Sequence, residues 1–368
     1  MIAMFRVFVC ISILALLFSC KGVEYSETAV SGYDGPLKEN GEGLSVQYTP
    51  IALEESQGSM LTNPQKIVLA DSLILISDDN RLLSFGLDGK YHGQIGCMGR
   101  GNGEYINLTT FYVDNKKAIT IFDSYRNVLL RYSIEGKPIG ETSLGNLELK
   151  FAQSILPLSD KELFVYNYLY NDYHSLAEIV NIETGDTEEV ASTPMCTNST
   201  MEYVGRNPYC SYGGKVRYLL PLDNRIYSLG DSTALCIDTK QTMYNEKDLQ
   251  NIKNFGMTTY ADCLNEIRFA GFSDIFETER YIVLACHNAI YTVVDKKTMS
   301  CKRFKYSMTA GARDEALYNI RGVYKNSLVG FFGTDDIEKL SSLGFDTPLM
   351  KSVKRLNSTQ VLVLQEIL

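Results

Sequence analysis

Short apolar segments alternate with polar turns along most of the chain, in the pattern of consecutive β-strands. A unit of three strands, joined first by a polar turn and then by a tight turn, returns roughly every 45 to 50 residues. A strand-only repeat of this length predicts units that pack radially and close into a ring, and six of them predict a six-bladed β-propeller, an all-β fold. The first strand of each unit is expected at residues 73–77, 118–122, 163–166, 216–220, 281–286 and 327–332.

The tight turns support this prediction, because glycine recurs where a two-residue hairpin needs a positive φ angle. Residues 83–90 match residues 130–137 position by position, with Gly89 and Gly136 in equivalent places, 47 positions apart (136 − 89). Gly185 and Gly230 follow the second strands of the third and fourth units. These second strands are expected at residues 81–85, 128–132, 177–182, 225–229 and 289–294.

The two ends of the repeat are predicted to close the ring. Residues 46–53 and 360–367 are both strand-like, so we expect them to pair within one blade. Residues 334–343 predict a short helix inside the sixth unit. Residues 244–255 and 260–269 have helical spacing and predict an insertion that decorates one face of the propeller, often the binding face.

The N-terminus predicts export and lipid attachment. Residues 1–19 have a basic residue followed by an apolar run too short to span a bilayer, which is typical of a secretory signal. The residues before Cys20 resemble a bacterial lipobox, so we expect cleavage there and acylation of Cys20; an incidental cysteine after an ordinary signal is the alternative. Without aspartate after the cysteine, the outer membrane is expected, on its surface or periplasmic face. Residues 20–43 are predicted to be a flexible tether and residues 44–368 the propeller domain.

Charge and cysteine content restrict the partners. The net charge is −9, with no basic block, which argues against nucleic acid. Nine cysteines are present; with one in the signal and one lipidated, seven remain. We expect Cys196 and Cys210, which flank a loop-like stretch, to form a disulfide, and the others to be small buried residues.

Several motifs together resemble a known family. Residues 83–96, the sequence GRGNGEY at residues 99–105, FYVD at residues 111–114 and VLVL at residues 361–364 are similar to those of six-bladed β-propeller lipoproteins of Bacteroidetes, whose architecture is NHL-like. Asn102 stands where that family commonly has proline, which makes the loop less rigid. The resemblance implies a role at the cell envelope, near systems that use glycans.

Two candidate binding surfaces follow. In the glycine-rich loop, Arg100, Asn102, Glu104 and Tyr105 accompany backbone amides that could bind a phosphate or carboxylate, although the loop lacks the end of a P-loop. Its structural alternative is a connection between blades in which Arg100 pairs with Glu104. The second surface is aromatic and could stack on sugar rings, with strand packing as the alternative. It consists of Tyr166, Tyr168, Tyr170 and Tyr173.

Metal and cofactor sites are not expected. The acidic residues 78–80 and 335–336 lack the spacing of a calcium loop, and His92, His174 and His287 lie far apart without a zinc motif.

We therefore predict a non-catalytic, monomeric envelope lipoprotein that touches the membrane only through its lipid anchor. It would bind a glycan, peptide or partner envelope protein on the face that holds residues 244–269. The alternative is a glycoside hydrolase or lyase with carboxylates gathered at the propeller axis.

Overall fold

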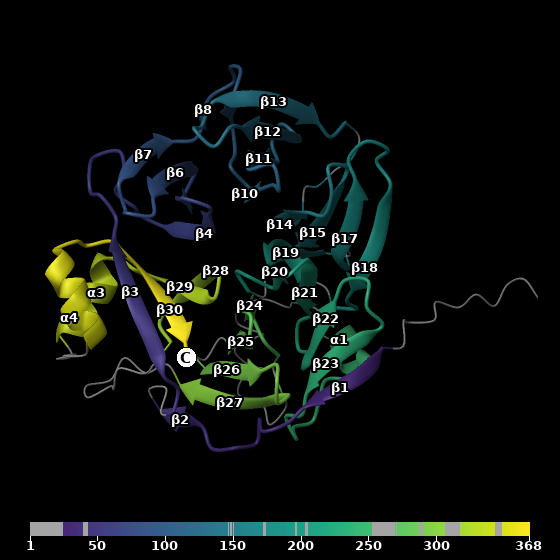
Figure 1. Ribbon diagram of the computed structural model, residues 1–368. Coiled ribbons are helices and arrows are strands. Elements are labelled where there is room, and N and C mark those ends of the chain that lie inside the picture. The colour runs from purple at the N-terminus through teal and green to yellow at the C-terminus, as the bar shows by residue number, and fades with distance from the viewer. Residues whose placement is uncertain are drawn as a thin grey trace, which may run out of the picture.

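The fold is a ring of six radiating β-sheets, which confirms the predicted six-bladed β-propeller (Figure 1). Four of these sheets have four strands and two have five, and two small two-stranded sheets lie beside them. The computed structural model describes residues 25–39, 43–145, 147, 149, 151–171, 174–195, 197–202, 205–251, 269, 271–286, 290–305, 317–342 and 348–368. The predicted signal segment, residues 1–19, and Cys20 lie outside these residues.

Each blade runs from an inner strand at the axis to an outer strand at the rim (Figure 1). In that order, blade 1 has β4 (Pro64–Ala70), β5 (Leu73–Asp78), β6 (Arg81–Gly86) and β7 (Tyr91–Gln94); blade 2 has β10 (Thr110–Val113), β11 (Ile119–Asp123), β12 (Val128–Tyr132) and β13 (Pro138–Ser143); blade 3 has β14 (Ala152–Pro157), β15 (Glu162–Asn167), β17 (Ser175–Asn181) and β18 (Thr187–Ser192); blade 4 has β20 (Tyr209–Tyr212), β21 (Lys215–Leu219), β22 (Arg225–Ser228) and β23 (Thr233–Ile237); blade 5 has β24 (Asp274–Glu277), β25 (Tyr281–Cys286), β26 (Ile290–Asp295) and β27 (Ser300–Lys305); blade 6 has β28 (Ile320–Tyr324), β29 (Ser327–Phe332), β30 (Val361–Ile367) and β3 (Val46–Ala52).

The predicted first strands are in fact the second strands of the blades, β5, β11, β15, β21, β25 and β29. The inner strands escaped the prediction because they border the axis, where polar residues interrupt the apolar pattern. β4, with sequence PQKIVLA, and β28, with sequence IRGVY, each place a cation in the strand. The number of blades was right, but each unit begins one strand earlier.

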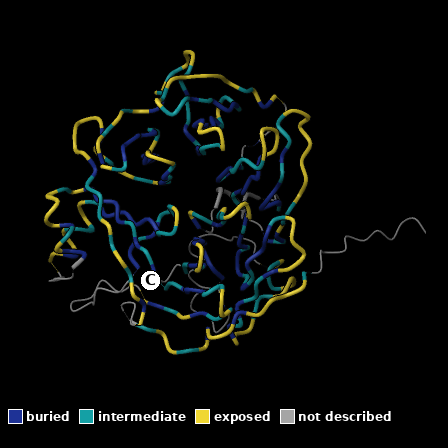
Figure 2. Tube along the Cα trace, viewed as in Figure 1, coloured by how far each residue is buried: buried dark blue, intermediate teal, exposed yellow. Residues whose placement is uncertain are grey.

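Among the described residues, an apolar cluster fills each of the six interfaces between neighbouring blades. β5 shows the principle, because all six of its residues are buried. Ile74 and Ile76 pack toward blade 6, whereas Leu75 packs toward blade 2. Figure 2 shows the result: buried segments within the blades and exposed turns on the rim. A strand with both faces covered needs a continuous apolar run, which is the pattern that revealed it.

The predicted closure is confirmed, since β3 from the N-terminal region pairs antiparallel with β30 at the C-terminus over Val46–Ala52 and Val361–Ile367. This pair of strands, which we call the seam, also contacts blade 1. Gly89, in the tight turn of that blade, has a φ angle of 83° and accepts a hydrogen bond from Glu54 N at 2.8 Å. A Cβ atom there would lie 1.8 Å from the carbonyl oxygen of Ala52, so only glycine fits at this point of the seam.

The predicted flexible tether over residues 20–43 is wrong for the part that the structure describes. β1 (Ser26–Val30) pairs in parallel with β23, and β2 (Lys38–Glu39) pairs in parallel with β27. Between them, Tyr33 is buried among Phe269 and Phe272 and stacks against the guanidinium of Arg303, 4.4 Å from the ring centroid. Polar composition hid this role, because edge strands on the rim bury only a few side chains while they cover the open edges of blades 4 and 5.

Among the residues that the structure describes, three helices decorate the ring. The predicted helix at residues 334–343 is confirmed as α3 (Thr334–Ser342), and α4 (Pro348–Leu356) follows it. Both pack on blade 6 and contribute to an apolar cluster with its strands. Of the predicted insertion over residues 244–269, the structure describes α1 (Glu246–Gln250) and Phe269, and the rest falls outside the described residues. Within the described part of the chain, no helix is long and apolar enough to cross a membrane.

Replacing Tyr33 by alanine tests whether residues 26–39 are docked. We expect Tyr33→Ala to lower the free energy of unfolding by about 3 to 5 kcal/mol, because it empties a buried aromatic site. Urea denaturation measures the loss. Glu27→Ala, which removes only the exposed ion pair with Arg225, serves as the control and should cost less than about 1 kcal/mol. If Tyr33→Ala were as stable as the native chain, the result would contradict docking of residues 26–39 and favour the flexible tether.

Candidate functional site

A cavity of about 250 Å³ lies on the propeller axis, and every blade contributes to its wall from its inner strand. The contributing strands surround the centre of the ring in Figure 1. A second hollow of about 280 Å³ continues it at one face, where the inner strands begin. The two share Lys66, Ser154 and Arg206, and we call the second hollow the axial mouth. It is lined by Asn63, Gln65, Lys66, Ser77, Thr109, Thr110, Gln153, Ser154, Tyr168 and Arg206.

Lys66 occupies the junction of the cavity and the mouth. Its Nζ atom donates to the carbonyl oxygen of Phe111 at 2.8 Å and reaches the hydroxyls of Thr110 and Ser154 at 3.4 Å. One lysine of blade 1 therefore touches blades 2 and 3. Among the described residues no carboxylate pairs with it, and burial lowers the pKa of Lys66 to about 8.

Arg206 is held at the mouth by its backbone. The N–H groups of Arg206 and Asn207 donate to Asp274 Oδ1 at 3.0 and 2.8 Å. Gly205 makes this approach possible, because a Cβ atom there would lie 1.7 Å from the carbonyl oxygen of Ser273. The side chain of Arg206 is exposed and forms no ion pair with another described side chain.

Two buried polar atoms of the wall have no hydrogen-bond partner among the described residues. Gln153 Oε1 lines the mouth, and its other amide atom, Nε2, already donates to the carbonyl oxygen of Gly205. Arg321 Nε lies on the cavity, in the inner strand of blade 6. Buried polar atoms usually have partners, so an acceptor left open at the mouth and a donor left open at the cavity that continues it point to a polar ligand.

The remaining polar groups of the cavity bind one another. Ser154 Oγ lies 2.9 Å from the hydroxyl of Tyr209, whose pKa burial raises to about 12. Glu277 is the one carboxylate in the described wall, and it accepts from Arg217 Nε at 2.8 Å and from Lys296 Nζ at 2.9 Å. A glycosidase needs two carboxylates facing one bond. The predicted pair of axial carboxylates is therefore absent from the described wall, where cations outnumber acids.

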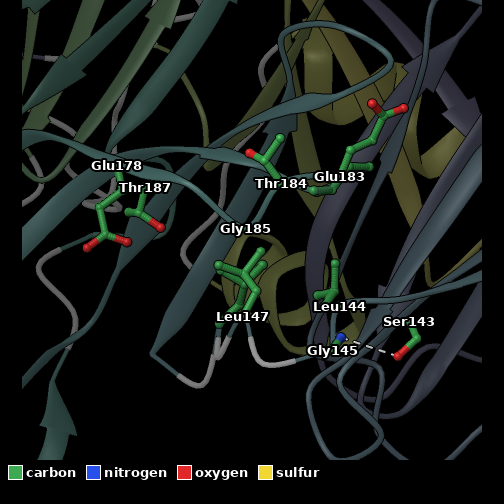
Figure 3. A pocket seen from close by; sticks show the side chains of 11 residues that line it. Ser143, Leu144, Gly145, Leu147, Glu178, Glu183, Thr184, Gly185 and Thr187 are labelled. Atoms are coloured by element: carbon green, nitrogen blue, oxygen red, sulfur yellow. Dashed lines mark hydrogen bonds between the residues drawn. The ribbon is translucent and has the colours of Figure 1, made fainter.

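An outer hollow of about 580 Å³ lies between blades 2 and 3 (Figure 3). It contains Glu178 and Glu183, but their carboxylates point away from each other in Figure 3. Glu183 is more than half exposed and pairs with Lys161 at 2.7 Å. Beside them, Gly145 N donates to Ser143 Oγ at 3.3 Å. We regard the axial cavity as the better candidate, because all six blades converge on it.

The predicted glycine-rich binding loop is a connection between blades 1 and 2. β8 (Cys97–Met98) pairs in parallel with β9 (Glu104–Tyr105) near the rim (Figure 1). Glu104 accepts from Gly101 N at 2.7 Å, and not from the arginine of the loop, while Tyr105 is fully buried. Arg100 and Asn102 are exposed on the loop. The structure thus does not bring these four residues to the axial cavity, and ligand binding by the loop stays a prediction.

The predicted tyrosine surface is divided by the structure. Tyr166 is buried between blades 3 and 4 and donates to the carbonyl oxygen of Leu219 at 2.9 Å, so it belongs to the core. Tyr168 lines the axial mouth. Tyr170 lies in β16 (Leu169–Asn171), which pairs with β19 (Thr197–Glu202), and Tyr173 lies outside the described residues.

The other candidates serve local structure where they are described. Asp78 accepts from the backbone of residues 62 and 63, and Asp336 accepts from Gly333 N at the start of α3. His174 contacts the carbonyl oxygen of Met195, while His287 falls outside the described residues.

Only one cysteine of the predicted disulfide, Cys210, lies among the described residues. Cys196 lies outside the described residues, and Cys210 is a free thiol in the wall of the axial cavity. Burial raises the pKa of the Cys210 thiol, which makes it unreactive.

The sequence analysis missed the residues of the axial cavity. Lys66, Ser154, Arg206 and Tyr209 come from three different units, and nothing in the chain marks them as neighbours. One signal was available: the apolar strand PQKIVLA contains a lysine, and burying an unpaired charge costs free energy, which is typical of a functional residue.

Comparison with known proteins places the chain in a family. The model of the family described as "Domain of unknown function (DUF4934)" matches residues 38–360. The chain belongs to the DUF4934 family. No curated protein sequence matches it.

Two solved structures support the fold of this DUF4934 protein. A Bacteroides fragilis protein that is predicted to be exported is 19% identical, with a TM-score of 0.72 over 93% of this chain and 100% of that one. A member of the DUF4221 family from Bacteroides vulgatus is 10% identical, with a TM-score of 0.51 over 88% of this chain and 97% of that one. At these identities the likeness concerns the fold alone.

The lowered pKa of Lys66 predicts a pH-dependent cost in this DUF4934 propeller. An unfolded lysine has a pKa near 10.5, so the folded protein bears the full cost of the buried charge below pH 8 and none well above pH 10.5. Lys66→Met removes this cost at every pH. Its advantage in unfolding free energy over the native chain should therefore shrink by about 2 kcal/mol between pH 7 and pH 9.5. Urea denaturation at both values measures it, and a constant difference would contradict a lysine titrating near pH 8.

Proposed function

We propose that this protein is a non-catalytic lipoprotein of the cell envelope that binds a small polar ligand in its axial mouth. The observation that carries the proposal is the convergence of all six inner strands on a cavity with two cations lacking described carboxylate partners and an unpartnered acceptor, Gln153 Oε1. Small-molecule sites typically combine such a cavity with a few placed polar groups.

The topology supports the mouth as the binding face. Every connection from an outer strand to the next inner strand reaches the ring on the side of the mouth, where residues 63–66, 109–110, 153–154 and 206 lie. The connection from β23 to β24 contains the predicted insertion, and its end at Asp274 binds the backbone of Arg206. The described end of this connection, at Asp274, therefore lies beside the mouth.

Binding is favoured over catalysis by the described wall. Its single carboxylate, Glu277, is bound by two cations and has no second acid beside it in this wall, whereas a glycosidase needs two carboxylates. A glycan or a peptide residue fits the size of the mouth, and we propose a monomer that presents this face to the surroundings.

Attachment to the outer membrane through Cys20 is supported by the lipobox-like residues before it. It also agrees with the predicted export of the similar Bacteroides fragilis protein. Because residues 26–39 are docked on blades 4 and 5, only residues 21–25 separate Cys20 from the ring. Five residues span at most about 18 Å, so the anchored propeller would lie close to the membrane.

Replacing the lipidated cysteine tests the anchor. In a bacterial host that acylates lipoproteins, Cys20→Ala should lose incorporation of labelled palmitate and leave the detergent phase for the aqueous phase, because its hydrophobic anchor is gone. Cys10→Ala, within the predicted signal, should keep both. Full labelling of Cys20→Ala would contradict acylation at this position.

Blocking the mouth tests the binding site. In a thermal-shift screen of the mature chain against glycans and short peptides, a ligand that raises the melting temperature of the native chain should not raise that of Ser154→Trp, whose indole fills the mouth. Ser143→Trp, in the outer hollow, should still respond. Circular dichroism confirms folding of both variants. A flat screen, or a ligand that still stabilises Ser154→Trp, would contradict a small-ligand site at the axis.

A further inference from the structure

The charge of the axial mouth is opposite to that of the whole protein. The chain has 44 acidic residues against 35 basic ones, yet the ten residues that line the mouth include two cations and no carboxylate. Lys66 and Arg206 both face this hollow without an ion pair to another described side chain. Two cations without a counter-charge in a confined space attract an anionic group.

The neutral groups of the mouth describe the rest of the ligand. Apart from Lys66 and Arg206, all the lining residues have amide or hydroxyl groups. Gln153 Oε1 is a buried acceptor without a described partner, and its orientation is fixed because Nε2 donates to the carbonyl oxygen of Gly205. Such an acceptor requires a donor on the ligand, which sulfate or a fatty acid carboxylate does not offer.

We propose that the axial mouth binds an acidic sugar, a hexuronic acid residue of a glycan, with its carboxylate between Lys66 and Arg206 and a ring hydroxyl donating to Gln153. The volume of about 280 Å³ suits one sugar ring rather than a longer segment. Tyr168, which also lines the mouth, offers an aromatic face for the ring. This inference rests on the proposed function, since it assigns the chemistry of the same site.

The existing contacts of Lys66 leave room for such a ligand. Its bonds to Thr110 and Ser154 are both 3.4 Å long, beyond the usual range for a hydrogen bond. A carboxylate can replace them while the 2.8 Å bond to the carbonyl of Phe111 remains. The charge of Lys66 would then have an anionic partner in the bound state.

Titration calorimetry with trigalacturonate tests the inference, and its methyl ester is the matched neutral probe. We expect the mature chain to bind the acid at least tenfold more tightly than the ester, and less tightly as salt is raised. Lys66→Met and Arg206→Met should each weaken binding of the acid at least tenfold. Lys116→Met, which removes an exposed cation paired with Asp160 away from the mouth, should leave it unchanged. Arg206 is exposed, so Arg206→Met tests the site without a change in the buried core.

The outcomes separate the inference from the proposed function. Equal binding of acid and ester that Lys66→Met leaves intact but Ser154→Trp abolishes would overturn the acidic sugar and keep the axial site. If Lys66→Met, Arg206→Met and Ser154→Trp all still bind the acid, the ligand lies elsewhere. That result would overturn both the acidic sugar and the axial site. An acetylated tripeptide with a free carboxylate that competes at equal affinity would replace the sugar by a peptide. Absence of binding to either saccharide would overturn the acidic sugar.

Discussion

The structure depends on one constraint: the middle strands of each blade are apolar on both faces, and only neighbouring blades can cover them. β5 of blade 1, for example, is buried along its whole length between blade 6 on one side and blade 2 on the other. A blade at an open end would expose one face. The ring must therefore close, which β3 and β30 achieve by joining the two ends of the chain in one sheet.

Closure also creates the site. The six inner strands are drawn together around the axis, where there is no neighbouring blade to cover them and polar side chains can meet. Lys66 contacts blades 2 and 3, and Ser154 of blade 3 reaches Tyr209 of blade 4. At the rim, by contrast, strand edges are covered: residues 26–39 pair with the outer strands of blades 4 and 5. Stability therefore comes from the rim and the interfaces between blades, and we assign recognition to the axis.

The fold could be predicted from the sequence because the patterns that indicate it lie within short segments of the chain. Apolar runs such as that of β5, and glycine in turns such as Gly89, follow from contacts that every blade repeats. The site could not be read in this way, since Lys66 and Arg206 are 140 positions apart (206 − 66) and meet only when the ring has closed. The docking of the polar residues 26–39 could not be predicted for a related reason: parallel edge pairing uses backbone groups, and of the side chains in this segment only a few, such as Tyr33, are buried.

The most direct test of the central claim is a crystal structure of the mature chain with trigalacturonate. We expect density for one sugar ring in the axial mouth, with its carboxylate within ion-pair distance of Lys66 Nζ. A ring bound in the outer hollow between blades 2 and 3, or on the glycine-rich loop at residues 99–105, with only water in the mouth, would contradict it.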